Sequence, residues 1–261
     1  MNEAPLKNRP QSYPRVTGIS RDEHVGMVRE MFATVTGRYD FLNHLLSLGR
    51  DVAWRRCAVR RMGFFHTFRF LDVATGTADL AIAAANAHPR IQVTGIDFSP
   101  EMLAVGRRKI GERRLEGRIR LLQADALTLP FPDGSFDAVG IAFGIRNMPD
   151  RLRALQEMRR VLAPGGRVFV LEMNFPRGRF GQGFFAFYLN RLLPRVARLF
   201  SGNPAAYHYL ADSILHFPGP RDFMNLMEAA GFHNPERRSL TFGITSLYIA
   251  SRPDSVGKTA S

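Results

Sequence analysis

The stretch from residue 68 to residue 97 constrains the fold of this chain more than any other feature. It opens with a mainly apolar run, 68–73, in which only Arg69 and Asp72 are charged, as expected for a parallel strand covered on both faces. Small residues follow from 74 to 78, and they allow backbone N–H groups to approach a ligand closely. A helix is expected to begin near Thr77, and a second strand, 91–96, leads to Asp97. This order predicts a βαβ unit of the nucleotide-binding type.

The same unit indicates which nucleotide ligand it holds. A carboxylate at Asp97, where the second strand ends, can accept hydrogen bonds from both hydroxyls of a ribose. The turn contains a single glycine, Gly76, and lacks the G-x-G-x-x-G pattern, so it offers few close N–H groups to a diphosphate. Asp72 would repel a phosphate and attract an ammonium group. A ribose and an ammonium group together describe S-adenosylmethionine, with a nicotinamide dinucleotide and a purely structural turn as the alternatives.

The remaining segments repeat the alternation of strands and helices. Strands are expected at 119–124, 136–143 and 167–173, followed by a closing hairpin of 235–240 and 243–250; helices are expected at 99–115, 151–162 and 221–230. Such alternation predicts an α/β fold with a mostly parallel sheet and right-handed crossovers. Ligands of such sheets bind at the carboxyl ends of the strands, where Asp72, Asp97, Asp125 and Ala142 are expected to lie.

The chain is long enough for one large core, so one domain over 21–251 is expected, between a flexible arm (1–20) and a flexible tail (252–261). Within it, helices in 21–62 are predicted to cap the carboxyl edge of the sheet. An insertion, 174–217, is rich in aromatic residues interrupted by arginines. It is interpreted either as an amphipathic surface for a bilayer or a lipid-tailed substrate, or as a lid helix packed on the core.

The charge of the chain favours an anionic partner. The formal net charge is +13, and all basic residues except three lysines are arginines. Because the arginines are scattered, an acidic membrane surface is favoured over nucleic acid, and biased genomic base composition is the alternative explanation. Cys57 is the only cysteine, which excludes an internal disulfide and fits a reducing cytoplasm. No apolar run reaches about 18 residues, so no spanning helix is expected.

Several polar residues near the expected strand ends suit specific roles, each with a simpler alternative. Asp97 could instead cap the helix that follows Ser99. Asp125, with Ala126 beside it, could accept from an adenine amine or form an Asx turn. Thr77 could bind the amino-acid end of the ligand or cap a helix. Arg146 and Asn147 could hold a phenolate or a quinol oxygen, or begin a helix.

Other chemistries find little support. No metal-ligand spacing such as H-E-x-x-H occurs, so no metal site is expected. The G-x-S-x-G elbow of hydrolases is also missing.

These residues together resemble the menaquinone/ubiquinone C-methyltransferase family over residues 25–250. The segments that carry the resemblance are Tyr39-Asp40-Phe41-Leu42-Asn43, Leu48-Gly49, Trp54-Arg55, Leu71–Asp79, Leu129-Pro130-Phe131, Phe136-Asp137, Phe143-Gly144-Ile145-Arg146-Asn147, Leu162-Ala163-Pro164-Gly165-Gly166-Arg167 and Tyr209-Leu210-Ala211-Asp212-Ser213-Ile214. The blocks 39–43 and 143–147 are specific to this family. The Pro-Gly-Gly turn and the first turn are shared by many class I methyltransferases.

The resemblance implies a seven-stranded class I methyltransferase, a Rossmann-like fold, with S-adenosylmethionine as its donor. The implied acceptor is a polyprenylated hydroquinone, methylated on a ring carbon: demethylmenaquinol or the 2-polyprenyl-6-methoxy-benzoquinol precursor of ubiquinol. The expected cofactor contacts are Asp72, Gly76, Thr77, Asp97, Asp125, Ala126 and Ala142; the expected catalytic residues are Arg146 and Asn147; and the expected substrate contacts are Tyr39, Asn43 and Tyr209.

The sequence departs from the family pattern at three places. Thr75 and Ala78 replace usual glycines, which predicts a tighter turn around the methionine part of the donor. Ala142 replaces a frequent serine, so its contact would come from the backbone. Met173-Asn174 replaces a usual Phe-Ser.

Some alternatives stay open at this point. A methyltransferase acting on another small molecule or on RNA, and a nicotinamide-dependent reductase, are the other candidate enzymes. The oligomeric state is open, with a homodimer among the options.

Overall fold

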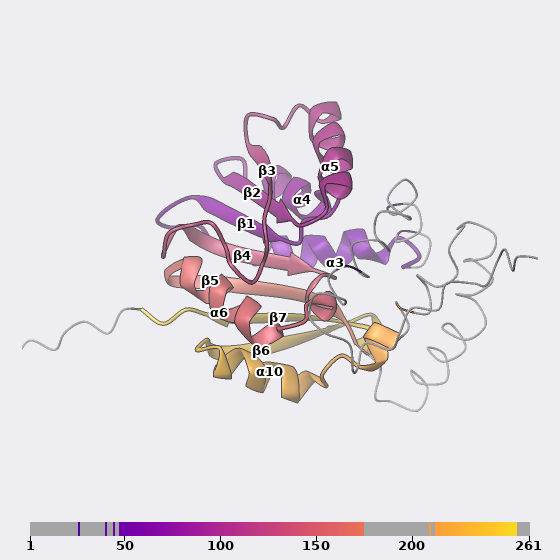
Figure 1. Cartoon of the computed structure of the whole chain (residues 1–261), viewed down its shortest axis with the longest axis vertical. Helices are drawn as coiled ribbons and strands as arrows, with labels where there is room; N and C mark the ends of the chain where they lie inside the picture. Colours follow the sequence, from indigo (N-terminus) through magenta and orange to yellow (C-terminus); the bar gives the residue numbers. More distant parts are fainter. Residues whose placement is uncertain are drawn as a thin grey trace, which may run out of the picture.

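The structure of the chain is a computed structural model that describes residues 26, 40, 44, 47–174, 209 and 212–254. These residues form a seven-stranded sheet with helices on both faces (Figure 1). The strands are β1 (Arg69–Val73), β2 (Gln92–Asp97), β3 (Ile119–Gln123), β4 (Phe136–Ala142), β5 (Leu162–Met173), β6 (His233–Leu240) and β7 (Thr245–Ser251). The described helices are α3 (Arg50–Val59), α4 (Asp79–Ala87), α5 (Pro100–Glu112), α6 (Arg151–Val161) and α10 (Pro220–Ala229), with 3-10 turns η2 (Ile145–Asn147) and η4 (Thr241–Gly243).

The sheet has the order β3-β2-β1-β4-β5-β7-β6. Strands β1 to β5 are parallel to one another, and β7 lies antiparallel between β5 and β6. The predicted α/β fold with a mostly parallel sheet and a closing hairpin is therefore confirmed. Because β1 pairs with β2 on one side and with β4 on the other, the strand order reverses there. Open α/β sheets bind their ligands in the crevice that such a reversal leaves at the carboxyl ends.

The sheet is buried on both faces, as the apolar run of β1 predicts. Phe70 and Leu71 are both fully buried but belong to different apolar clusters, because successive side chains of a strand point to opposite faces. The cluster around Phe70 includes residues of α3, α4 and α5. The cluster around Leu71 includes residues of α6 and α10. The two layers hold the strand ends in fixed positions, and these strand ends carry the candidate site.

Several predicted boundaries need correction. The first helix begins at Asp79, two residues after Thr77, because Ala78 adopts a left-handed conformation (φ 68°) at the N-cap position. Strand β5 begins at Leu162 and not at Arg167, since Leu162 already pairs with β4. By contrast, Ser99 caps α5 as predicted, accepting a hydrogen bond from Met102 N at 3.3 Å.

The predicted helical cap and lid are described only in part. Helix α3 lies within the expected 21–62 cap, whereas residues 1–20 and most of 174–217 lie outside the described residues. In the part of the chain that the structure describes, no helix combines the length and the apolar character needed to cross a bilayer.

Candidate functional site

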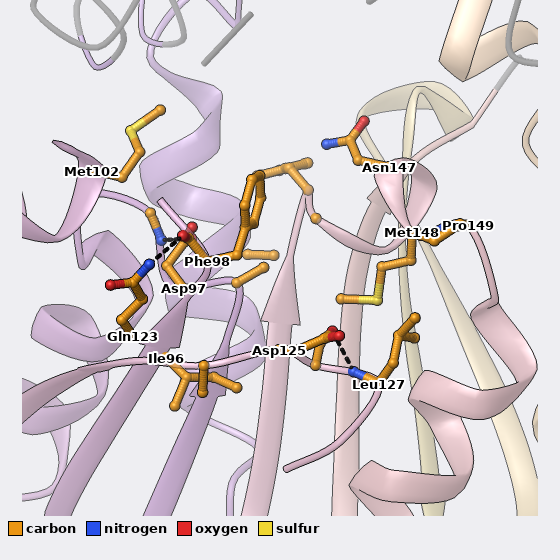
Figure 2. Close-up of a pocket in the computed structure, with 17 residues that line it drawn as sticks. Ile96, Asp97, Phe98, Met102, Gln123, Asp125, Leu127, Asn147, Met148 and Pro149 are labelled. Carbon is orange, nitrogen blue, oxygen red and sulfur yellow. Dashed lines mark hydrogen bonds between the residues drawn. The ribbon is translucent and has the colours of Figure 1, made fainter. Parts of the chain in front are cut away.

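A cavity of about 520 Å³ opens where strands β1 to β4 end (Figure 2). Its volume lies within the range of roughly 300–1,000 Å³ that is typical of small-molecule and cofactor sites. The residues that line it are Ala74, Gly76, Ile96, Asp97, Phe98, Met102, Gln123, Ala124, Asp125, Ala126, Leu127, Ala142, Phe143, Gly144, Asn147, Met148 and Pro149. It therefore brings together Gly76, Asp97, Asp125, Ala126, Ala142 and Asn147 from the predicted site residues.

Asp97 joins the turn after β1 to the end of β2. Its Oδ2 accepts a hydrogen bond from Gly76 N at 2.8 Å, and its Oδ1 accepts one from Ser99 N at 3.0 Å. Burial raises the pKa of this carboxyl, and the N–H donors of Ser99, Gly76 and Phe98 act in the opposite direction. An ionised carboxylate has about four acceptor positions, so acceptor capacity remains for a ligand in the cavity beside these N–H donors. The arrangement suits a pair of neighbouring hydroxyl donors. The alternative role at the start of α5 also holds in part, because Ser99 N is one of the donors.

Gly76 allows the turn to come this close to Asp97. It has a positive φ of 55°, which a residue without a Cβ adopts readily, and a Cβ built there would meet no atom within 4 Å. Conformation, and not lack of space, therefore favours glycine at this position.

Asp125 forms the Asx turn considered for it and also faces the cavity. Its Oδ1 accepts a hydrogen bond from Leu127 N at 2.8 Å, which forms an Asx turn after β3. Asp125 also lines the cavity (Figure 2), and so does Ala126, the next residue in the chain. The turn therefore fixes a carboxylate at the cavity wall, where it can accept a hydrogen bond from a ligand amine.

Asp72 lies next to the end of β1, as predicted, but it is not among the residues that line the cavity. Its Oδ2 accepts hydrogen bonds from Thr75 Oγ1 at 2.6 Å and from Ala81 N at 3.0 Å. Burial raises its pKa to about 7, although these two donors and nearby Arg55 lower it. These contacts turn the carboxylate towards Thr75 and the start of α4. Its carboxylate holds the turn from below.

Thr77 is also directed away from the cavity. Its hydroxyl donates to Asp40 Oδ1 at 2.5 Å and lies 3.1 Å from Lys109 Nζ. Lys109 pairs in addition with Asp40 Oδ2 at 2.6 Å and with Asp79 Oδ1 at 2.5 Å. Because Lys109 belongs to α5 and is only 9% exposed, this buried ammonium group ties the first turn to the segment that precedes α3.

A cluster of three acidic or imidazole side chains lies close to this lysine, but cations of the protein already neutralise it. His44, Asp51 and Asp79 place ligand-type atoms within 4.8 Å of one another. Arg55 lies 2.5 Å from Asp51 and 3.4 Å from Asp79. The cluster is therefore a salt-bridge network between α3 and α4.

Arg146 and Asn147 take different directions from the same short turn, η2. Asn147 lines the cavity, whereas Arg146 does not; its Nη1 lies 2.5 Å from Glu172 Oε1 in β5. Helix α6 is capped by Asp150, whose side chain accepts a hydrogen bond from Arg153 N at 2.9 Å. The alternative in which Arg146 and Asn147 begin this helix, with Asn147 as its cap, is therefore wrong.

The predicted substrate contacts are only partly described. Tyr209 is 4% exposed, and its pKa is raised to about 12 by burial, against the lowering effect of Arg146 and Arg151. Tyr39 and Asn43 lie outside the described residues.

Sequence patterns did not indicate the apolar walls of the cavity. Phe98, Met102 and Met148 line it, together with Leu127. A weak signal was available, because Phe98 directly follows Asp97 and Met148 directly follows Asn147. Apolar walls of this kind suit a flat aromatic base.

The comparisons with known proteins agree with this geometry. The model of the ubiE/COQ5 methyltransferase family matches residues 19–252. The ubiquinone/menaquinone biosynthesis C-methyltransferase UbiE of Geobacter sulfurreducens is 46% identical over 226 residues, which cover 86% of this chain and 88% of that protein. The demethylmenaquinone methyltransferase of Thermus thermophilus is 49% identical over 224 residues, which cover 85% of this chain and 100% of that protein.

Solved structures confirm the fold. The phosphoethanolamine N-methyltransferase 2 of Haemonchus contortus in complex with S-adenosyl-L-methionine has a TM-score of 0.59 at 18% identity, over 77% of this chain and 53% of that one. The S-adenosylmethionine-dependent methyltransferase SibL has a TM-score of 0.55 at 26% identity, over 82% of this chain and 57% of that one. The chain therefore has the fold of class I S-adenosylmethionine-dependent methyltransferases.

Proposed function

The chain belongs to the ubiE/COQ5 methyltransferase family, and from this premise we propose that it transfers the methyl group of S-adenosylmethionine to a ring carbon of a polyprenylated hydroquinone. The acceptor is demethylmenaquinol, the benzoquinol precursor of ubiquinol, or both. The observation that carries the proposal is the cavity at the ends of β1 to β4, in which Asp97 keeps acceptor positions for a ribose.

The residues of the cavity fit this donor. Asp97 would bind the ribose hydroxyls, and Asp125 with Ala126 would meet the adenine between apolar walls. Gly76 would face the amino-acid part, and the turn around it has no glycine run for a diphosphate. When bound, S-adenosylmethionine supplies an electrophilic methyl group on a positively charged sulfur. A ligand with a ribose and no phosphate is the best match to this set of side chains.

The protein's part in the chemistry is to orient an electron-rich ring and stabilise its oxygen. A carbon attacks more readily when an adjacent hydroxyl becomes a phenolate. We place Asn147, which lines the cavity, beside this oxygen, together with Arg146, its neighbour on η2 just past the end of β4. Preorganised donors for a developing charge lower the barrier most effectively in a site shielded from water. In-line alignment of the reacting carbon supplies a further part of the rate.

Transfer of a labelled methyl group to each reduced quinone tests the proposed function. We expect product from at least one of demethylmenaquinol and the benzoquinol precursor, and none from the oxidised quinones, whose ring carbons are poor nucleophiles. A protein that binds S-adenosylmethionine but methylates neither hydroquinone would contradict the proposal.

Arg146→Ala is expected to lower kcat by about 10²–10³-fold, the usual loss for one donor to a developing oxyanion. The change also leaves Glu172 unpaired in the interior, which costs about 3–5 kcal/mol of stability. Arg146→Lys keeps the charge and should retain more of the rate and the fold. Arg153→Ala is a matched control, since this side chain is 51% exposed and Glu157, its partner, is also held by Arg160. A folded Arg146→Ala protein with the wild-type kcat would exclude the proposed role.

The lipid tail of the acceptor suggests that the protein works at a membrane surface. We propose peripheral contact with an anionic, cytoplasmic membrane face, supported by the net charge of +13 and by exposed apolar side chains. Phe242 is 96% exposed and Leu48 77% exposed. Phe242 follows Thr241, whose Oγ1 accepts a hydrogen bond from Trp54 in α3 at 2.8 Å, and Leu48 precedes α3. Co-sedimentation with vesicles checks this: equal partition to neutral and anionic vesicles would contradict the role of charge.

A further inference from the structure

A buried polar cluster beside the cavity has a hydroxyl group without a hydrogen-bond partner. Among the described residues, no donor or acceptor reaches Tyr209 Oη, although the residue is only 4% exposed. A buried hydroxyl that makes no hydrogen bond is unfavourable, and native proteins rarely keep one without a reason. The guanidinium groups of Arg146 and Arg151 lie close enough to influence the ionisation of this phenol. The Tyr209 hydroxyl, which lies close to two cationic side chains, can therefore form a hydrogen bond with a ligand atom.

Glu172 fixes one of these cations. Its Oε1 lies 2.5 Å from Arg146 Nη1, and its Oε2 accepts a hydrogen bond from Arg146 N at 3.2 Å. One carboxylate thus holds both the side chain and the backbone of the same arginine. Met173 N donates to Oε1 as well, at 2.9 Å, and Glu172 is fully buried in β5. Because β5 lies between β4 and β7, the position of the guanidinium is set by the rigid part of the sheet.

The charges of the cluster suit an anionic oxygen. The charge of Glu172 pairs directly with Arg146 and also reaches Arg151, which makes no salt bridge among the described residues; Arg151 Nη2 donates to Arg146 O at 3.1 Å. Asp212, whose charge also reaches Tyr209, lies 3.1 Å from His216 Nδ1. Tyr209 keeps its proton at neutral pH, since its pKa is raised to about 12 by burial. It can therefore donate a hydrogen bond but cannot act as a base there.

We propose that Tyr209 and Arg146 bind one ring oxygen of the acceptor, as a hydroxyl or more tightly as a phenolate, and that Glu172 is the positioning residue for Arg146. The site adjoins the cavity, because Gly144 and Asn147, on either side of Arg146 in the chain, both line it. This inference rests on the proposed function and adds to it the residues that select an oxygen-bearing aromatic ring.

Tyr209→Phe is the sharpest test, because it removes only the unpartnered oxygen. We expect Tm to stay unchanged or to rise, while kcat/KM for the hydroquinone falls by about 10–100-fold, the factor for one hydrogen bond to a charged oxygen. The dissociation constant of S-adenosylmethionine should not change. Tyr248→Phe is the matched control: Tyr248 is fully buried and its hydroxyl is 3.0 Å from Asn174 Nδ2, so Tm should fall by about 2–4 °C with kcat/KM preserved.

Glu172→Gln tests the positioning role. It should lower kcat, and its effect should not add to that of Tyr209→Phe in the double variant, since both act on the same oxygen. Wild-type kcat/KM in Tyr209→Phe, or a lowered Tm in that variant with no specific loss for the acceptor, would overturn the inference. If the wild-type protein itself methylates no hydroquinone, the proposed function fails first, so the two failures can be distinguished.

Discussion

Replacing Asp97 with alanine is expected to raise the dissociation constant of S-adenosylmethionine by about 10²–10⁴-fold. Acceptor capacity of this carboxylate remains for ligand hydroxyls beside the N–H donors of Gly76, Ser99 and Phe98. Each hydrogen bond to a charged group contributes about 1.5–3 kcal/mol, so two ribose hydroxyls account for a loss of this size. Isothermal titration calorimetry with S-adenosylmethionine and its demethylated product measures the change directly.

A second cavity residue provides the control for this experiment. Gln123 lines the same cavity, and its Nε2 donates to Phe98 O at 3.1 Å. Gln123→Ala should change the dissociation constant by less than about 5-fold, since it removes no charged acceptor. Asp97→Ala also frees Gly76 N, so a circular dichroism spectrum and Tm must first show that the variant is folded. Wild-type affinity in folded Asp97→Ala protein would remove the main support for the cofactor site.

Asp137→Ala is expected to lower the free energy of unfolding by about 3–5 kcal/mol. The carboxylate of this buried residue accepts hydrogen bonds from four consecutive backbone N–H groups, those of residues 65–68, at 2.9–3.1 Å. Each orphaned buried donor costs about 1–3 kcal/mol, and water can replace part of this loss because residues 65 and 66 are exposed. Urea unfolding at pH 7 measures the loss. Asp133→Ala is the control, because Asp133 is 70% exposed in its pair with Arg160, and such pairs contribute about 0–1 kcal/mol.

The stabilisation by Asp137 should also depend on pH. Burial raises the pKa of this carboxyl, but the four N–H donors together lower it by more than burial raises it. The pKa in the folded protein therefore lies below its usual value of 3.8. A carboxyl with a depressed folded pKa stabilises the fold above its unfolded pKa. The stability difference between wild type and Asp137→Ala should therefore be constant above about pH 5 and shrink as the pH falls below 3.8. A difference that persisted at the lowest pH would show that the ionised form is not responsible.

Local patterns predicted the fold and the cofactor side of the site because their signals are short-range. The apolar run of β1, the small-residue turn and the Ser99 cap each lie within a few neighbouring residues. In a parallel sheet the carboxyl ends meet at one edge, so Asp97 and Asp125 come together without knowledge of any tertiary contact. The same reasoning could not show that Thr75 Oγ1 and Ala81 N hold the Asp72 carboxylate, which does not line the cavity.

Contacts between distant segments could not be read in the same way. Asp137 holds a loop about 70 residues earlier in the chain, and Glu172 holds Arg146 from a neighbouring strand. The lysine contact of Thr77 likewise requires α5 to pack over the turn. These pairings depend on how the layers pack, and no periodicity or spacing in the sequence encodes the choice of partner.

The hydrogen bond between Gly76 N and Asp97 has a practical consequence. One carboxylate oxygen holds the backbone of the turn, and the same carboxylate faces the donor site. A ligand that donates a hydrogen bond to this carboxylate weakens the hydrogen bond that the carboxylate accepts from Gly76 N. The NMR chemical shift of the Gly76 amide should therefore change when the donor binds. This signal can follow donor binding and turnover without a label on the ligand.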